Sequence, residues 1–238
     1  MTKLQLCQSL ILNTAISGTM TSTANQTGEF QRVVAWIDEA WNELQTFKDE
    51  WDWMRSSVLL GSGAVFPTVA GQWEYPLGTD PGDCGVDEAD FGMWDRYTFR
   101  CYTTSAGTKN DETFLDPIPY DYWRDAYMYG AQQQVQTRPV AVAIGPNKSV
   151  CIGPPSNGLY TIEADYWLAP SVMDDDDAVP AGLPERFHML IVYKAMMKYG
   201  YYEAAPEVVG RADREYKTLF ASLEARYTPE VRTAGALA

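Results

Sequence analysis

The strongest constraint on this fold lies in residues 183–224, which predict two consecutive amphipathic helices hinged at Gly200. Pro184 and Pro206 each have the fixed φ and the missing N–H that suit a first helical turn. Apolar residues recur at helical spacing in both segments: Phe187, Leu190, Ile191, Ala195 and Tyr199, then Val209, Ala212, Tyr216, Leu219 and Leu223. Both apolar stripes need a partner elsewhere in the chain.

Charged residues on the second of these helices stand four positions apart, as in Glu207 with Arg211 and Asp213 with Lys217. With Arg211 and Glu215 these make three pairs, which together contribute about 1 to 1.5 kcal/mol, no more than the burial of one large apolar side chain. The apolar stripe therefore decides where this helix packs.

Two more helices are predicted near the N-terminus. The first has a helical apolar face made of Leu4, Cys7, Ile11 and Ala15. Polar residues interrupt its apolar run, which argues against a cleaved signal peptide: Gln5, Gln8 and Asn13. The second helix begins near Gly28 and carries apolar residues at helical positions: Phe30, Val33, Val34, Ile37, Trp41 and Leu44.

Between the helical ends, the pattern changes to short alternating runs bounded by Gly, Pro and Asp, which is typical of antiparallel strands. Strands are predicted at Val58–Leu60, Gln72–Leu77, Tyr97–Tyr102 and Thr113–Ile118, and a short helix at 119–130. Further along, residues 140–144, 149–152 and 158–168 predict a three-stranded meander.

These elements predict an α+β fold. Residues 1–55 and 183–226 would form one antiparallel helical bundle, because each segment has an apolar face that the other can cover. Residues 56–182 would be an inserted antiparallel β domain with one short helix, and residues 227–238 a C-terminal tail. Trp51 and Trp53 stand two positions apart, so we expect them to pack at the junction of the helical and β parts, with a ligand-binding platform as the alternative.

Composition and motifs indicate no catalytic chemistry and no cofactor. The 4 cysteines are scattered without a Cys-x-x-Cys pair, and His188 is the only histidine. Asp174, Asp176 and Glu185 match three positions of an EF-hand loop, but Val179 stands where that loop needs glycine. No run of apolar residues is long enough to cross a membrane. The chain is therefore predicted to be neither an enzyme nor a metal or membrane protein.

Charge distribution argues against specific nucleic-acid binding. The formal net charge is −14, and residues 72–125 hold 12 acids and 4 bases, a balance of −8. Tight DNA binding requires clustered Lys and Arg. An acidic middle would suit a conduit through which DNA slides without sticking, or it would only keep the protein soluble.

Two stretches of the chain resemble a known family: TGEFQRVVAWIDEAWNELQTFKDEWDWM near the N-terminus, and VPAGLPERFHMLIVYKAMMKYGYYEAAPEVVGRADREYKTLFASLEA near the C-terminus. Together with the strand-rich middle, they resemble the head-tail adaptor (connector) proteins of tailed bacteriophages, in particular the portal-adaptor or tail tubular proteins of short-tailed phages. The resemblance extends over nearly the whole chain and includes no catalytic signature.

That resemblance implies a virion protein of the phage neck, assembled in the host cytoplasm. It implies a homo-oligomeric ring, commonly twelve-fold in the family, that lies under the portal protein, extends the DNA channel and contacts the next tail or nozzle protein. It also implies portal contacts from the C-terminal segment, here Arg226, Tyr227, Thr228, Pro229, Glu230, Val231 and Arg232.

The acidic, glycine-rich segment 78–92 is predicted to be an exposed, mobile loop. Its carboxylates would contact a neighbouring copy or the tail: Asp80, Asp83, Asp87, Glu88 and Asp90. An alternative function is a carbohydrate-binding or carbohydrate-cleaving tail protein, because the 8 Trp and 15 Tyr residues could offer sugar platforms and the many acids could offer a carboxylate pair.

Overall fold

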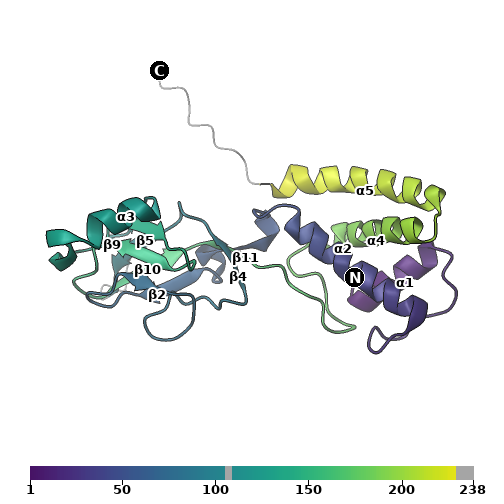
Figure 1. Ribbon diagram of the computed structural model, residues 1–238, viewed down its shortest axis with the longest axis horizontal. Coiled ribbons are helices and arrows are strands. Elements are labelled where there is room, and N and C mark those ends of the chain that lie inside the picture. Colours follow the sequence, from purple (N-terminus) through teal and green to yellow (C-terminus); the bar gives the residue numbers. More distant parts are fainter. Residues whose placement is uncertain (105–108, 229–238) are drawn as a thin grey trace, which may run out of the picture. The chain divides into compact units, whose positions relative to one another are not determined.

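The computed structural model describes residues 1–104 and 109–228 and has an α+β fold, as predicted (Figure 1). The helices are α1 Lys3–Asn13, α2 Gly28–Thr46, α3 Tyr120–Tyr127, α4 Met189–Tyr202 and α5 Pro206–Tyr227. The chain divides into two compact units. The helical unit contains Met1–Met54 and the residues from Pro170 onward, and the β unit contains Arg55–Ala169.

Helix α4 is the centre of the helical unit, because α1, α2 and α5 all pack against it. All five residues of the predicted apolar stripe are buried: Leu190, Ile191, Ala195 and Tyr199 on α4, and Phe187 in the 3-10 turn before it. Of the six apolar positions predicted on α2, four are buried, Val33, Ile37, Trp41 and Leu44, whereas Phe30 and Val34 are half-buried.

Helix α1 differs from its prediction. Thr2 and Gln5 form a capping box that starts the helix, and the helix ends at Asn13, so Ala15 lies beyond it and is exposed. The buried face of α1 consists of Leu6, Cys7, Leu10 and Ile11.

The segment from Pro170 to Gly182 belongs to the helical unit, although the sequence pattern placed it in the β domain. Its carbonyl groups accept hydrogen bonds from the start of α1, where the Lys3 amide donates to Ala178 at 2.8 Å. The Gln45 side chain of α2 holds it as well, donating from Nε2 to the Ser171 carbonyl at 2.9 Å.

The β unit contains three small sheets, with strand orders β1-β11-β4, β2-β10-β5-β6 and β3-β9-β8-β7. All pairs are antiparallel except β7 with β8. The strands are β1 Arg55–Ser56, β2 Ala64–Pro67, β3 Glu74–Tyr75, β4 Phe91–Trp94, β5 Arg100–Thr103, β6 Thr113–Phe114, β7 Asp116–Pro117, β8 Ala141–Ile144, β9 Val150–Gly153, β10 Tyr160–Ala164 and β11 Tyr166–Leu168.

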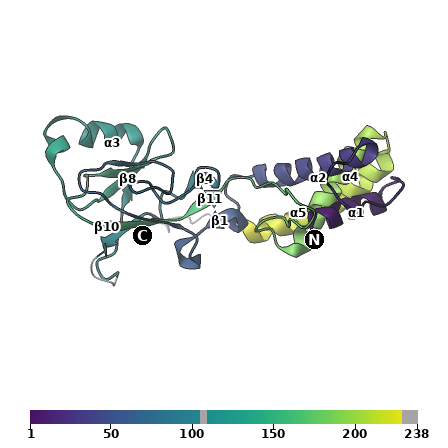
Figure 2. The ribbon, with the colours of Figure 1, turned by 90° about the horizontal axis from the view of Figure 1, so that it is seen from below.

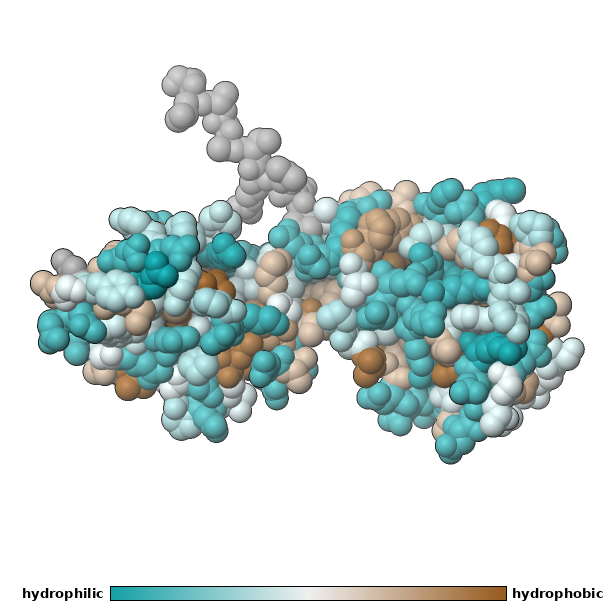
Figure 3. Space-filling model, in the orientation of Figure 1, coloured by the Kyte–Doolittle hydropathy of each residue, from teal (hydrophilic) through white to brown (hydrophobic). Residues whose placement is uncertain are grey.

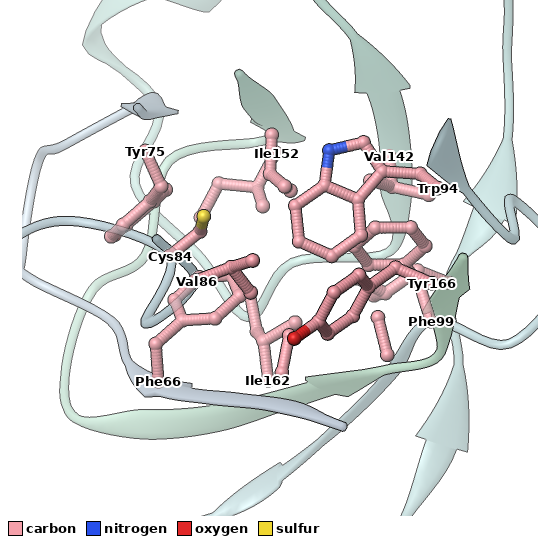
Figure 4. Close-up of a cluster of buried hydrophobic side chains, with 14 of the residues drawn as sticks. Phe66, Tyr75, Cys84, Val86, Trp94, Phe99, Val142, Ile152, Ile162 and Tyr166 are labelled. Atoms are coloured by element: carbon pink, nitrogen blue, oxygen red, sulfur yellow. The ribbon is translucent and has the colours of Figure 1, made fainter. Parts of the chain in front are cut away.

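Aromatic and branched side chains from these sheets meet in one core (Figure 4). Phe66, Tyr75, Trp94, Phe99 and Ile162 are among its members. Helix α3 covers a smaller cluster beside β8 and β9, where the buried Trp123 donates from Nε1 to the Ile152 carbonyl at 2.9 Å.

Two strand predictions are wrong. Val58–Leu60 forms a 3-10 turn and not a strand. The three-stranded meander does not form either: β8 pairs with β9, but β9 pairs next with β3, whereas β10 pairs with β2 and β5. Pro154 and Pro155 lie between β9 and β10, and because proline lacks an N–H it cannot extend a strand ladder across that connection.

Candidate interaction surfaces

The acidic loop, residues 78–92, is anchored to the β unit, contrary to the predicted mobile loop. Cys84 and Val86 are buried in the core beneath it. Backbone hydrogen bonds fix the loop: the Gly78 amide donates to Val86 at 2.7 Å within it, and the Cys84 amide donates to Pro76, just before it, at 2.9 Å. The apolar residues at positions 84 and 86 thus outweigh the acidic composition that suggested mobility.

Most of the carboxylates predicted on this loop face solvent. Asp80, Asp87, Glu88 and Asp90 are exposed, whereas Asp83 is half-buried and accepts a hydrogen bond from the Asp80 amide at 3.1 Å. None of the five forms an ion pair with a Lys or Arg of the described residues. The loop therefore presents a fixed set of uncompensated negative charges.

The C-terminal end of α5 carries the first three residues of the predicted portal contact. Arg226 is exposed, but Tyr227 is held by Arg186, whose guanidinium donates to the Tyr227 hydroxyl at 3.0 Å. The Thr228 hydroxyl accepts from Lys48 Nζ at 3.0 Å. The remaining predicted contacts lie outside the described residues: Pro229, Glu230, Val231 and Arg232.

A turn with two exposed leucines follows β1, and the sequence pattern missed it. Leu59 is 87% exposed and Leu60 is 81% exposed. The turn ends at Gly61, whose φ of 76° is in the left-handed region that favours glycine. Gly61 and Gly63 directly after two leucines were the available signal for a turn, because alternation alone cannot distinguish a strand from a 3-10 turn of this length.

Buried Asp165 holds this turn in place. Its carboxylate accepts hydrogen bonds from the Val58 amide at 2.9 Å and from the Ser57 hydroxyl at 3.2 Å, and it pairs with Arg55 at 3.0 Å. Within the turn, the Leu60 amide donates to Ser57 at 3.1 Å. We define residues 57–62, with Leu59 and Leu60 at the tip, as the leucine turn.

An apolar groove lies at the end of α1, with a volume of about 300 Å³. Ile11 and Met20 are buried at its floor, and Leu12 at its rim is 85% exposed. Gln8 supports one wall, because its Nε2 donates to the Met20 carbonyl at 2.9 Å. The rest of the lining is Gly18 and Thr19, and we call this the α1 groove.

The tryptophans serve packing and not a surface platform. None of the 8 is exposed. Trp51 is fully buried, and its Nε1 donates to the Leu44 carbonyl at 3.2 Å, while Trp53 stacks near Trp41 with ring centroids 5.7 Å apart. The expected core packing is therefore confirmed for Trp51, whereas Trp53 is half-buried beside it, with ring centroids 6.1 Å apart.

The cysteines have the properties of residues packed in a protein interior. All four cysteines are free and buried, and burial raises the thiol pKa to about 12 for Cys7 and Cys151 and to about 11 for Cys84 and Cys101. Within the described ranges, no cluster of three or more His, Cys, Asp or Glu side chains could hold a metal ion. No helix in the described part of the chain is both long and apolar enough to span a membrane.

Most basic side chains of the helical unit pair with acids or with the backbone, as on the seam between α2 and α4. Lys198 bridges Glu39 at 2.9 Å and Glu43 at 2.6 Å, and Lys194 adds a second contact to Glu43 at 3.1 Å. Figure 3 shows a largely hydrophilic face over these helices, with small apolar patches on both units. Paired lysines of this kind are poor phosphate ligands, because a carboxylate already compensates their charge.

Comparison with protein-family models gives a match over residues 1–237 to the family described as SU10 adaptor protein. The match includes both helical ends and the β unit between them. A comparison with curated proteins gives no match.

Proposed function

The chain belongs to the SU10 adaptor protein family, and from that premise we propose that it forms a ring under the phage portal, extends the DNA channel and provides the docking surface for the tail. Family membership implies a structural virion component that contacts portal and tail proteins. The family match over the whole chain is the observation that carries the proposal, and it supports a role without catalysis.

The geometry supports a rigid structural part. The central helix α4 is buried on several sides, and the leucine turn and the acidic loop are each anchored to the β unit by hydrogen bonds or buried side chains. Rigid surfaces of this kind lower the entropic cost of association. The tryptophans give no support to sugar binding, because five of the 8 are buried and the other three are half-buried.

The charge of the molecule supports passage of DNA without specific binding. A net charge of −14 repels phosphates, and the carboxylates of the acidic loop have no compensating base among the described residues. We propose the acidic loop as a contact to the tail or to a neighbouring copy, and the segment from Arg226 onward as the portal contact.

Removal of the chain from its phage tests this proposal. We expect the mutant to produce heads that carry portal, are DNA-filled or leaking, and have no tails. We expect a tagged copy supplied in trans to restore infectivity. Electron microscopy of the restored neck should show a ring of this chain between portal and tail. Complete, infective particles that lack the chain would contradict the proposal, as would its absence from purified virions.

A further inference from the structure

The leucine turn and the α1 groove contain the three most exposed large apolar side chains of the described residues. These are Leu59, Leu12 and Leu60, at 87%, 85% and 81% exposure. Single exposed leucines are common, but two adjacent leucines on a fixed turn form a projecting apolar tip. Figure 2 labels β1, the strand that precedes this turn in the chain. Such a tip needs an apolar receptor.

The leucine turn is built so that the tip cannot collapse onto the protein. The carboxylate of Asp165 holds its backbone and Ser57, and the Ser56 hydroxyl donates to the Ser62 carbonyl on the far side of the turn. At Gly63 a Cβ would lie 2.3 Å from the Val58 nitrogen, so only glycine allows the closure. The exposure of Leu59 and Leu60 is therefore a property of the folded turn.

The α1 groove has the complementary surface. Its floor of Ile11 and Met20 is apolar, its rim is the exposed Leu12, and it is roomy at about 300 Å³. Neither surface contains a charged residue: the turn reads SVLLGS, and the groove is lined by Gln8, Ile11, Leu12, Gly18, Thr19 and Met20.

The absence of charge from both surfaces favours a second copy of this chain as the partner. Copies of a chain with a net charge of −14 repel one another, so they associate best through surfaces that carry no charge. A ring also requires two different surfaces on each copy, one for each neighbour. On the basis of the proposed ring function, we propose that the leucine turn of one copy inserts into the α1 groove of the next copy.

Cysteine cross-linking in assembled particles tests this contact. Leu60→Cys and Leu12→Cys would be placed on separately tagged full-length chains that are co-assembled with portal, then treated with a short bis-maleimide. The four native cysteines are buried with raised thiol pKa values, so they contribute little background. We expect an adduct that contains both tags, and a ladder of multimers when one chain carries both substitutions.

In the matched control, Leu159→Cys is used in place of Leu60→Cys. Leu159 is 57% exposed and lies in the same unit, and we expect no adduct between Leu159→Cys and Leu12→Cys. No two-tag adduct in particles that contain the ring would overturn the contact while leaving the proposed function intact. A link within one chain, or a link from Leu60→Cys to portal or tail protein, would also overturn it. If the chain is missing from the particles, the proposed function fails instead.

A second measurement uses charge. The double substitution Leu59→Asp with Leu60→Asp should leave the melting temperature unchanged, because both side chains are already solvated, and should lower incorporation into particles by about tenfold or more. The variant Leu159→Asp should incorporate normally. Normal incorporation of the double variant would overturn the proposal.

Discussion

At the scale of single residues, Lys3 carries a buried charge in the helical unit. It is 6% exposed, and its Nζ donates to Asp38 Oδ2 at 2.9 Å and to the Met173 carbonyl at 2.8 Å. We expect Lys3→Met to lower the free energy of unfolding by about 2 kcal/mol, because two acceptors lose a charged donor. The loss is no larger because Asp38 is partly solvated. Urea denaturation would measure this loss.

The control for Lys3 is Lys217, which pairs with Asp213 at 2.7 Å but is 73% exposed. Lys217→Met should change the free energy of unfolding by about 0.5 kcal/mol or less, because water already solvates both charges. Equal losses for the two variants would show that burial does not set the strength of the Lys3 contacts.

His188 makes stability depend on pH. It is 2% exposed, and burial lowers the pKa of its imidazole below the ordinary value of 6.5, while Nε2 lies 2.9 Å from the Leu183 carbonyl oxygen. The unfolded state therefore binds a proton more readily than the folded state. The free energy of unfolding is retained above the ordinary pKa, where the imidazole is neutral in both states, and is lost as pH falls toward the lowered pKa.

We expect wild-type protein to lose more unfolding free energy than His188→Gln between about pH 7.5 and about pH 5.5, as measured by urea denaturation at each pH. Taking the difference between the two proteins removes the contribution of groups that titrate alike in both. The same pH dependence in both proteins would mean that His188 is not the titrating group.

Some single-residue environments follow from the sequence and others cannot. Trp51 and the apolar positions of α4 are predictable because helical spacing reports burial. Glu163 and Asp165 alternate with apolar residues and so read as solvent-facing, yet they are 3% and 8% exposed. Their partners, Lys109 at 2.6 Å and Arg55 at 3.0 Å, lie 54 and 110 residues away, so no local pattern reveals them.

At the scale of elements, the contact between α4 and α5 depends on one glycine. A Cβ on Gly200 would lie 2.6 Å from Val209 Cγ2 and 3.2 Å from the Ala205 carbonyl oxygen. We expect Gly200→Ala to destabilise the protein by about 1 to 3 kcal/mol through overpacking, despite the higher helix propensity of alanine. Thermal unfolding followed by circular dichroism would measure the change.

Gly210 on α5 is the matched control, since nothing lies within 4 Å of a Cβ built there. Gly210→Ala should raise stability by about 0.5 to 1 kcal/mol, because only helix propensity and the entropy of the unfolded chain change. Changes of the same sign in both variants would contradict the close approach at Gly200.

The end of α5 defines where a truncation should begin. Tyr227 and Thr228 are hydrogen-bonded to Arg186 and Lys48, so a chain that stops at Thr228 keeps both contacts. We expect this truncation to leave the melting temperature unchanged and to weaken attachment to portal-containing heads in a sedimentation assay. Unchanged attachment would assign docking to the helical unit itself, and Arg226→Glu in the full chain would then show whether the helix end takes part.

Helices were more predictable than strands for a physical reason. Residues 28–46 and 206–227 contain several turns of a 3.6-residue period, which a single segment displays by itself. The strands have two to five residues, and their partners depend on the whole β unit, so the alternation at 160–168 could not show that β10 would pair with β2 and β5. The leucine turn was misread for the same reason.

At the scale of the whole molecule, the two ends of the β unit meet within a single strand pair. Arg55 in β1 lies opposite Trp167 in β11 in an antiparallel register. Directly opposed residues of such a pair have Cα atoms about 4.5 to 5.5 Å apart. The β unit is therefore inserted into the helical unit at one point. The first helical segment ends at Met54 and the second begins at Pro170, a few residues from the paired Arg55 and Trp167.

This geometry predicts that the β unit can be removed. Replacing residues 55–169 with about four Gly and Ser residues spans the gap, since each extended residue covers about 3.3 Å or more. The contacts of segment 170–182 with Lys3 and Gln45 would remain. We expect a helical protein that unfolds cooperatively, measured by circular dichroism during heating. A broad, non-cooperative transition would show that the helical unit needs the β unit to fold. A matched deletion of 55–182 should be less stable, because it removes the Ala178 and Ser171 acceptors that hold α1 and α2.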